Sequence, residues 1–237
     1  MSIFHFKHFS ISQANATMKV GTDAMVLGAL ITALGKKRGL DIGTGTGVLP
    51  LMLAQCNENL EIDAIEIDKD SAVEAKFNFD ESKWSGRLHS IQADVLDFNT
   101  DEKYDLIFSN PPYYQNSLQS ENARVARAKH ESFLPVDSML LAVDQLLAEN
   151  GEFWIIVPAE SGQSSWVMSC VKLGIHLKKE IAIHGKESDP IKRMIYCFSR
   201  SQSVLERRSL TIRSLDGSYT DEYIQLTSEY HGIDLRK

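Results

Sequence analysis

The stretch Leu40-Asp41-Ile42-Gly43-Thr44-Gly45-Thr46-Gly47 decides the fold, together with the apolar run of residues 48–54 that follows it. Its first three residues predict a short buried strand, and the apolar run predicts a helix. Glycines between a strand and a helix let a ligand approach the backbone closely at the helix N-terminus. The stretch therefore predicts an α/β fold with a ligand site at this turn.

The spacing of these glycines narrows the class of ligand. The pattern is G-x-G-x-G and not the G-x-G-x-x-G of dinucleotide-binding enzymes. No acid and base pair suited to hydride transfer stands out elsewhere in the sequence. An NAD-dependent dehydrogenase is therefore the weakest of the enzyme classes that this turn suggests.

Carboxylates follow the next two predicted strands. Glu66 ends the strand of residues 62–66, about 20 residues past the glycines, where an acid can accept both hydroxyls of a ribose. Glu66 could instead cap the helix predicted over residues 71–79, although Asp68 and Asp70 also suit that role. Asp94 follows the strand of residues 88–92 and could receive the exocyclic amine of an adenine, or simply close a turn.

The glycines Gly43, Gly45 and Gly47 thus combine with Glu66 and Asp94 into a predicted nucleoside pocket. A second site follows the strand of residues 104–108, where the sequence reads Ser109-Asn110-Pro111-Pro112-Tyr113-Tyr114. Two prolines fix two φ angles and push the preceding asparagine out of the helical region. Asn110 is therefore expected at a rigid tip at the carboxyl end of its strand, the edge where open α/β sheets bind ligands.

The rest of the chain continues the alternation of strands and helices. Helices are predicted over residues 24–34, with Thr22 or Asp23 as N-cap and Gly35 as terminator, and over 135–147, 161–173 and 221–230; strands are predicted over 153–158, 175–184, 194–198 and 210–213. These elements predict a mainly parallel sheet with an antiparallel late strand and helices on both faces. The polar stretch of residues 115–133 is a candidate phosphate contact through Arg124, Arg127, Lys129 and His130, or a solvated loop.

Composition excludes several broad classes. The chain has 237 residues and a formal net charge of −7, which argues against binding nucleic acid through bulk charge but allows a local basic face. Its three cysteines are widely spaced, as expected of reduced core residues in a cytoplasmic protein. Neither a signal peptide nor a membrane span is expected from the hydropathy pattern. A soluble enzyme or binding domain remains.

The Asn-Pro-Pro-Tyr tip indicates a particular chemistry. An amide oxygen, a proline carbonyl and an aromatic ring supply two acceptors for a planar amine and a face on which its ring can stack. Acceptors out of the amine plane favour a pyramidal nitrogen and stabilise the positive charge that develops as it attacks. With a sulfonium methyl donor as electrophile, neither a metal nor a strong general base is required.

These motifs resemble those of the class I S-adenosylmethionine-dependent methyltransferases that act on planar amino nitrogens. The resemblance extends to Met18-Lys19-Val20-Gly21-Thr22-Asp23 and to the tail Ser218-Tyr219-Thr220-Asp221-Glu222-Tyr223. Nearly the full length looks like the bacterial tRNA (adenine-N6) methyltransferases that modify the adenosine beside the anticodon of valine tRNA. The resemblance implies S-adenosyl-L-methionine as donor and the tRNA anticodon stem-loop as partner.

The resemblance also assigns roles to residues. It implies that Asn110 and the Pro111 carbonyl hold the target amine, that Pro112 fixes the tip and that Tyr113 stacks on the flipped-out base. The donor-binding residues it implies are Lys19, Thr22, Asp41, Gly43, Gly45, Gly47, Glu66, Asp94 and Asn110. It further implies a single domain over residues 1–237, with a segment that closes the donor pocket (1–35), a catalytic core (36–200) and a C-terminal strand and helix extension (201–237).

Other functions remain open on the sequence. A protein glutamine-N5 methyltransferase also uses Asn-Pro-Pro-Tyr, but those enzymes usually carry a helical N-terminal domain, and about forty residues precede the glycines here. A guanine-N2 rRNA methyltransferase would use similar chemistry, whereas no target-recognition domain of a DNA adenine methyltransferase is visible. A nucleotide-binding module that has lost catalysis is the alternative outside the enzymes.

Overall fold

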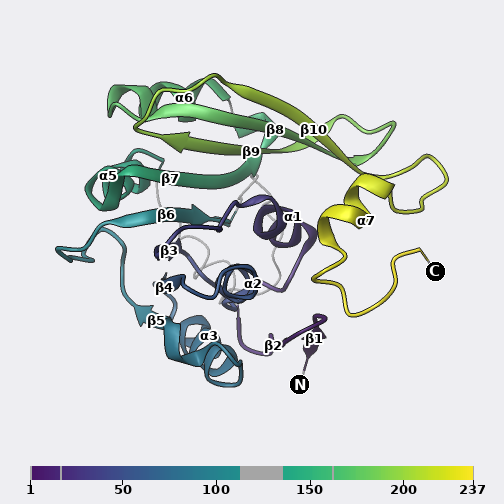
Figure 1. The fold of residues 1–237 in the computed structure, drawn as a ribbon, viewed down its shortest axis with the longest axis horizontal. Coiled ribbons are helices and arrows are strands. Elements are labelled where there is room, and N and C mark those ends of the chain that lie inside the picture. Colours follow the sequence, from purple (N-terminus) through teal and green to yellow (C-terminus); the bar gives the residue numbers. More distant parts are fainter. Residues whose placement is uncertain (1, 17, 113–135, 162, 237) are drawn as a thin grey trace, which may run out of the picture.

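The protein is built around one eight-stranded sheet. The structure is a computed structural model that describes residues 2–16, 18–112, 136–161 and 163–236. The strand order is β10-β8-β9-β7-β6-β3-β4-β5, and Figure 1 shows these strands stacked from β10 at the top to β5 at the bottom. A separate two-stranded hairpin, β1 with β2, lies near the N-terminus (Figure 1).

The bounds of the elements follow the chain. The strands are β1 (Ile3–His5), β2 (Ser10–Ser12), β3 (Arg38–Ile42), β4 (Glu61–Glu66), β5 (Leu88–Gln92), β6 (Tyr104–Ser109), β7 (Leu147–Pro158), β8 (His176–Lys186), β9 (Ile191–Ser199) and β10 (Glu206–Arg213). The helices are α1 (Thr22–Leu30), α2 (Val48–Cys56), α3 (Lys69–Asp80), α5 (Val136–Leu146), α6 (Gln163–Lys172) and α7 (Asp221–Thr227), with short 3-10 turns η1 (Ser85–Arg87) and η2 (Ala159–Ser161).

The central strands are buried on both faces, because alternate side chains enter two different cores. In β6, Leu106 and Phe108 pack into the core beneath α1, α2, α3 and α7, whereas Ile107 packs into the core beneath α5 and α6. In β7, Trp154 and Phe153 divide in the same way. A continuous apolar run, and not an alternating one, is what such a doubly covered strand requires.

The sheet reverses its order of strands at the boundary between β3 and β6. Strands β3 to β7 pair in parallel, β9 is antiparallel to both β7 and β8, and β10 is parallel to β8. All strands of this sheet except β9 therefore end at one edge, which we call the carboxyl edge. The predicted mainly parallel sheet with an antiparallel late strand and helices on both faces is confirmed.

Several predicted element boundaries are wrong. Helix α1 begins at Thr22 with Gly21 as N-cap and no side-chain cap, and the chain is already extended at Ile31, before Gly35. Asp23 does not cap the helix because its carboxylate pairs with Arg193 at 2.7 Å. The hairpin β1–β2 was not predicted, because three-residue strands carry too little periodicity to be recognised.

The second wrong boundary is the start of β7, which begins at Leu147 and not at residue 153. Tyr104 pairs with Leu147 but Leu106 pairs with Glu152, so the strand makes an irregular step between them. A Cβ on Gly151 would lie 2.9 Å from the Tyr104 carbonyl oxygen. Gly151 therefore allows close backbone approach within a strand.

The tail motif is a helix start. The Thr220 side chain accepts a hydrogen bond from the Tyr223 N–H and donates one to the Thr211 carbonyl, while Asp221 and Glu222 fill the first turn of α7. Helix α7 ends at Thr227, three residues earlier than predicted. The motif thus fixes α7 against β10.

Candidate active site

The glycine-rich turn lies between β3 and α2 at the carboxyl edge. The Gly43 and Thr44 N–H groups both donate to the Ile65 carbonyl of β4, at 2.9 and 3.1 Å. Gly43, Gly45 and Gly47 have φ angles of +75°, +56° and +79°, which residues with a Cβ rarely adopt. The turn is therefore pinned to the neighbouring strand in a conformation that needs glycine.

The glycines differ in what surrounds them. A Cβ on Gly47 would lie 2.4 Å from a ring carbon of Phe79, so this glycine allows α3 to pack against the turn. A Cβ on Gly43 or Gly45 would meet nothing within 4 Å among the described residues. Space beside Gly43 and Gly45 is what a ligand that contacts the backbone requires.

Glu66 faces the same turn from the end of β4. Its carboxylate accepts hydrogen bonds from the Gly45 N–H at 2.9 Å and the Asp68 N–H at 3.0 Å, and burial raises its pKa. Asp68, not Glu66, caps α3, through a 2.9 Å hydrogen bond from the Ser71 N–H. The helix-capping alternative for Glu66 is therefore excluded, and its remaining lone pairs are available to a ribose.

Asp41 is the least satisfied acidic side chain of the site. It is 1% exposed, and among the described residues neither carboxylate oxygen has a hydrogen-bond partner of good geometry, although the nearby Thr44 hydroxyl partly offsets the effect of burial on its pKa. Burial raises the pKa of Asp41 to about 8. A buried carboxylate without a partner is costly, and a cationic group bound beside it would relieve that cost.

Asp94 has the turn-closing role that the sequence left open, and its contact with an adenine amine stays a prediction. One carboxylate oxygen accepts a 2.9 Å hydrogen bond from the Leu96 N–H, as in an ordinary turn. The Ala93 N–H donates to the Glu66 carbonyl at 3.0 Å, which holds this strand end beside β4. Turn formation accounts for one oxygen of Asp94, and the half-buried carboxylate stays at the carboxyl edge with the glycine turn.

The Asn-Pro-Pro tip leaves β6 next to the glycine turn. Asp41 pairs with Phe108 across β3 and β6, so Gly43 and Asn110 each follow two residues after a paired position. Ser109 is fully buried and donates a 2.7 Å hydrogen bond to the Ile42 carbonyl. Asn110, Pro111 and Pro112 are half-buried, and Tyr113 lies outside the described residues.

The donor-binding residues predicted near the N-terminus are Lys19 and Thr22. Thr22 is exposed in the first turn of α1, and Lys19 is exposed in the segment before it. No described contact joins either residue to the glycine turn. Their donor-binding role stays a prediction, as do the individual roles of the other site residues.

Three residues of this region were not predicted from the sequence. Ser109 ties the tip to β3, and Glu74 and Asn78 of α3 bind the segment that precedes α1. A signal existed for the last two, since Glu74 and Asn78 stand four residues apart on the helix face that Ala75 and Phe79 turn to the core. Polar residues on such a face need partners when buried.

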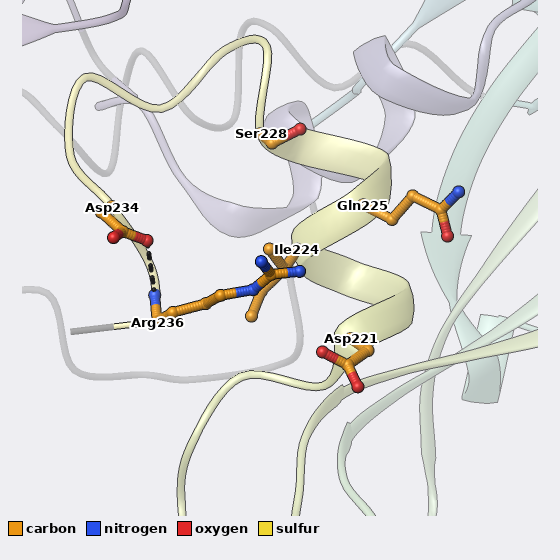
Figure 2. Close-up of a pocket in the computed structure, with 6 residues that line it drawn as sticks. All are labelled: Asp221, Ile224, Gln225, Ser228, Asp234 and Arg236. Atoms are coloured by element: carbon orange, nitrogen blue, oxygen red, sulfur yellow. Dashed lines mark hydrogen bonds between the residues drawn. The ribbon is translucent and has the colours of Figure 1, made fainter.

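Other features of the surface contain none of the predicted site residues. A hollow of about 520 Å³ lies between α7 and the C-terminal tail (Figure 2), lined by Asp221, Ile224, Gln225, Ser228, Asp234 and Arg236. Within the described ranges, no group of three or more metal-binding side chains is found. Nor does any helix there have the length and apolar character needed to cross a membrane.

Comparison with known proteins identifies the family. The model of the family described as "Methyltransferase small domain" matches residues 14–173. A tRNA1(Val) (adenine(37)-N6)-methyltransferase from Phocaeicola vulgatus is 36% identical over 229 residues, which are 96% of this chain and 97% of the relative. A protein of the same name from Actinobacillus pleuropneumoniae serotype 7 is 38% identical and covers 96% of each chain.

Solved structures agree on the fold. A predicted O-methyltransferase from Agrobacterium tumefaciens superimposes with a TM-score of 0.67 at 18% identity, over 88% of this chain and 96% of its own. A putative RNA methyltransferase from Pyrococcus horikoshii gives a TM-score of 0.53 at 20% identity, over 75% and 80% of the two chains. The predicted class I methyltransferase fold is confirmed.

The site also fits the donor that the sequence predicts. S-adenosyl-L-methionine carries a cationic amino group and ribose hydroxyls, which match the buried Asp41 carboxylate and the acceptors of Glu66. The open space beside Gly43 and Gly45 admits a group against the backbone. Family and fold together confirm this donor. The chain belongs to the methyltransferase small domain family and, within it, groups with the tRNA1(Val) (adenine(37)-N6)-methyltransferases.

Proposed function

We propose that this protein transfers a methyl group from S-adenosyl-L-methionine to the exocyclic N6 of adenine 37 in valine tRNA, beside the anticodon. One observation carries the proposal beyond family membership: the register of Asp41 with Phe108 puts the Asn110 tip and the glycine turn on adjacent strands. An amine held at the tip and a donor held at the turn would therefore meet at the switch point of the sheet.

The chain's own residues account for the chemistry expected at the tip. When bound, the donor supplies an electrophilic methyl group. The Asn110 side-chain oxygen and the Pro111 carbonyl accept hydrogen bonds from the two N–H groups of the adenine amine. These bonds direct the nitrogen lone pair toward the methyl donor. These acceptors gain strength as the nitrogen becomes positive, so they act on the transition state more than on the bound substrate.

Rigidity of the tip is part of the mechanism. Pro111 and Pro112 restrict the backbone, and the Ser109 hydroxyl fixes the strand end to Ile42. Positioning of this kind supplies a large share of the rate without a metal or a strong base. Tyr113 would stack on the base, and a base in the anticodon loop is already largely unpaired, so it is turned outward at low cost.

The anticodon stem is proposed to lie along the outer part of the carboxyl edge. Arg213 at the end of β10 pairs in register with Lys186 at the end of β8. The exposed Arg213 guanidinium lies 4.0 Å from the centre of the Tyr219 ring. Two cations and an aromatic ring on the edge that carries Asn110 suit contact with phosphate and sugar in an otherwise acidic protein.

Nearby acids limit this surface to a local attraction. Lys192 pairs with Asp189 at 3.0 Å and Arg193 with Asp23 at 2.7 Å, so these two cations are partly neutralised. Lys186 and Arg213 lack such close ion pairs among the described residues, although the exposed Asp216 carboxylate interacts with Lys186 at longer range. The proposal therefore rests on these two cations. The stretch of residues 115–133, also predicted to contact phosphate, lies outside the described residues.

The remaining predictions about organisation follow from this function. We propose a single methyltransferase domain divided into the segment of residues 1–35, the catalytic core of residues 36–200 and the extension of residues 201–237. We also propose a cytoplasmic location, because that is where a tRNA substrate would be available.

A labelled-donor assay tests the function. The protein is incubated with radiolabelled S-adenosyl-L-methionine and a valine tRNA transcript, and the RNA is digested to nucleosides. We expect labelled N6-methyladenosine, and none from a transcript with purine riboside at position 37, because that nucleoside lacks the exocyclic amine. Label in guanosine, or in glutamine of a protein fraction, would overturn the proposal, and so would donor binding without transfer to any pool.

A further inference from the structure

The buried carboxylate of Glu74 holds the segment that precedes α1. Glu74 is 4% exposed and lies on the core side of α3. One oxygen accepts from the Ala14 N–H at 2.7 Å and the other from the Ala16 N–H at 2.6 Å. The Asn15 N–H reaches both oxygens, at 3.3 and 3.0 Å, and the Ser12 hydroxyl adds a bond at 3.1 Å.

Three successive backbone N–H groups around one carboxylate form an anion-binding concavity. The partners are separated from Glu74 by about sixty positions in the chain, so the contact is purely tertiary. Loss of the carboxylate would leave three backbone donors of residues 14–16 without their acceptor. The conformation of this segment therefore depends on Glu74.

Asn78, one turn further along α3, connects the same segment to the glycine turn. Its side-chain amide donates to the Thr46 carbonyl at 2.8 Å and to the Ser12 carbonyl at 2.9 Å. Its oxygen accepts from the Ser12 N–H at 2.8 Å. A single side chain thus bridges the turn that faces the donor and the start of the segment.

The segment is closed at its other end by Gln13. The Gln13 side-chain oxygen accepts from the Val20 N–H at 2.9 Å, and the residue itself is buried. Residues 13 and 20 are therefore tied together, with Met18 and Lys19 exposed between them and α1 following directly. Glu74 and Asn78 accordingly anchor residues 12–16, and Gln13 extends this connection to Val20.

We infer that Glu74 and Asn78 are positioning residues for the methyl donor, because together they bind residues 12–16, which Asn78 links to the glycine turn. The inference rests on the proposed function only in naming the donor. The pair acts before the acceptor is involved: it orders the segment in the free protein, so the donor need not order it on binding. Glu74 and Asn78 are expected to set donor affinity and to affect methyl transfer at saturation little.

The test compares Glu74→Ala, Glu74→Gln and a control at the C-cap of the same helix, Glu81→Ala, whose side chain is exposed. Binding of S-adenosylhomocysteine is measured by calorimetry, and amide exchange of residues 12–20 is measured with and without that ligand. Neither readout requires RNA. Turnover at saturating donor and tRNA is measured separately.

We expect Glu74→Ala to raise the Kd of S-adenosylhomocysteine about 10-fold or more, as a preorganised segment becomes mobile. Amides of residues 14–16 should exchange faster, whereas those of β4 should not change. Glu74→Gln keeps one acceptor oxygen and should restore part of the affinity. Turnover at saturation should stay within about threefold in both variants, and Glu81→Ala should match the wild type.

A second variant tests the inference independently, in case Glu74→Ala does not fold. Ala16→Pro removes the N–H that makes the 2.6 Å bond and leaves α3 untouched, so it should weaken the ligand in the same direction. Faster exchange in residues 14–16 with unchanged affinity in these variants would overturn the inference. If the wild type binds the ligand as expected but methylates no tRNA, the proposed function fails while the positioning role stands.

Discussion

The Ser109 hydroxyl donates a 2.7 Å hydrogen bond to the Ile42 carbonyl, and this bond joins the end of the strand that carries Asn110 to the end of the strand that carries the glycine turn. Both ends are buried where they meet. The relative position of acceptor tip and donor turn therefore depends on one side chain as well as on the register of the sheet.

The Ser109→Ala variant tests whether this hydrogen bond affects kcat in addition to the free energy of unfolding. The change leaves the Ile42 carbonyl without its side-chain partner, which costs about 1–3 kcal/mol of unfolding free energy. Loosening of the tip should lower kcat about 10-fold. Denaturant unfolding and steady-state kinetics measure the two effects.

Ser90→Ala is the matched control for Ser109→Ala. The Ser90 hydroxyl also donates to a carbonyl, that of Ala72 at 2.8 Å, but it lies in β5 away from the tip. A similar loss of stability with unchanged kcat is expected. Equal losses of kcat in both variants would mean that Ser109 acts through stability alone.

Asn110→Ala should lower kcat about 100-fold or more and should weaken donor binding far less. The side-chain oxygen of Asn110 is proposed to stabilise charge that develops only as the amine attacks, and removal of one such group typically has this size of effect. Single-turnover kinetics with separately measured donor binding test it. Comparable losses in donor affinity and in kcat would count against the role.

Tyr113→Ala should raise the KM for tRNA, whereas Tyr113→Phe should not. The aromatic face, and not the hydroxyl, is expected to stack on the target base, and such stacking is worth about 1–3 kcal/mol per base. That energy corresponds to a rise of about 5- to 150-fold in KM. Unchanged RNA methylation by Tyr113→Ala would show that no stacking on this ring is needed.

The raised pKa of Asp41 should make both stability and donor binding depend on pH. Because burial raises its pKa from 3.8 to about 8, the folded, donor-free protein keeps a proton that the unfolded chain releases. Its contribution to stability is therefore present at low pH and is lost as the pH rises through this interval. As the pH rises through this interval, the Tm of Asp41→Asn should fall less than the Tm of the wild type.

A cationic amino group beside Asp41 should favour the carboxylate and release the proton. Calorimetry of S-adenosylhomocysteine binding near pH 7, in two buffers of different ionisation enthalpy, should show proton release by the wild type and less release by Asp41→Asn. Glu66, whose pKa is also raised, stays intact in both proteins and serves as the internal reference. Equal release from both proteins would exclude Asp41 as the group responsible.

The proposed RNA surface predicts a change in salt dependence. Replacing Lys186 and Arg213 by alanine should weaken tRNA binding and reduce the slope of log K against log salt by about 1 for each lost phosphate contact. Donor affinity should not change. The control removes Lys37 and Lys103, which precede β3 and β6 at the opposite edge of the sheet.

Binding titrations at several salt concentrations distinguish the two pairs. The control has the same change in net charge, so it should leave the slope nearly unaltered. If both double variants reduce the slope equally, the effect is one of overall charge and the outer carboxyl edge is not the RNA surface.

How much the sequence determined can be judged from particular elements. The glycine-rich stretch predicted a turn, because glycine adopts positive φ angles at lower cost than other residues. The structure confirms positive φ angles at Gly43, Gly45 and Gly47. The prolines after Asn110 likewise restrict their own backbone. Buried runs such as residues 104–108 were long and apolar enough to define central strands.

What the sequence alone determined was therefore the set of local constraints: strands, glycine turn, rigid tip, and an acid after each of two strands. The tertiary structure decided which of them meet. The register of β3 with β6 brings together the strand ends that lead to Gly43 and Asn110. Ser109 binds the Ile42 carbonyl, and Glu74 binds three N–H groups about sixty residues away in the chain. Local patterns reflect the conformational preferences of a few neighbouring residues, whereas these contacts depend on sheet order and helix packing, which no short stretch encodes.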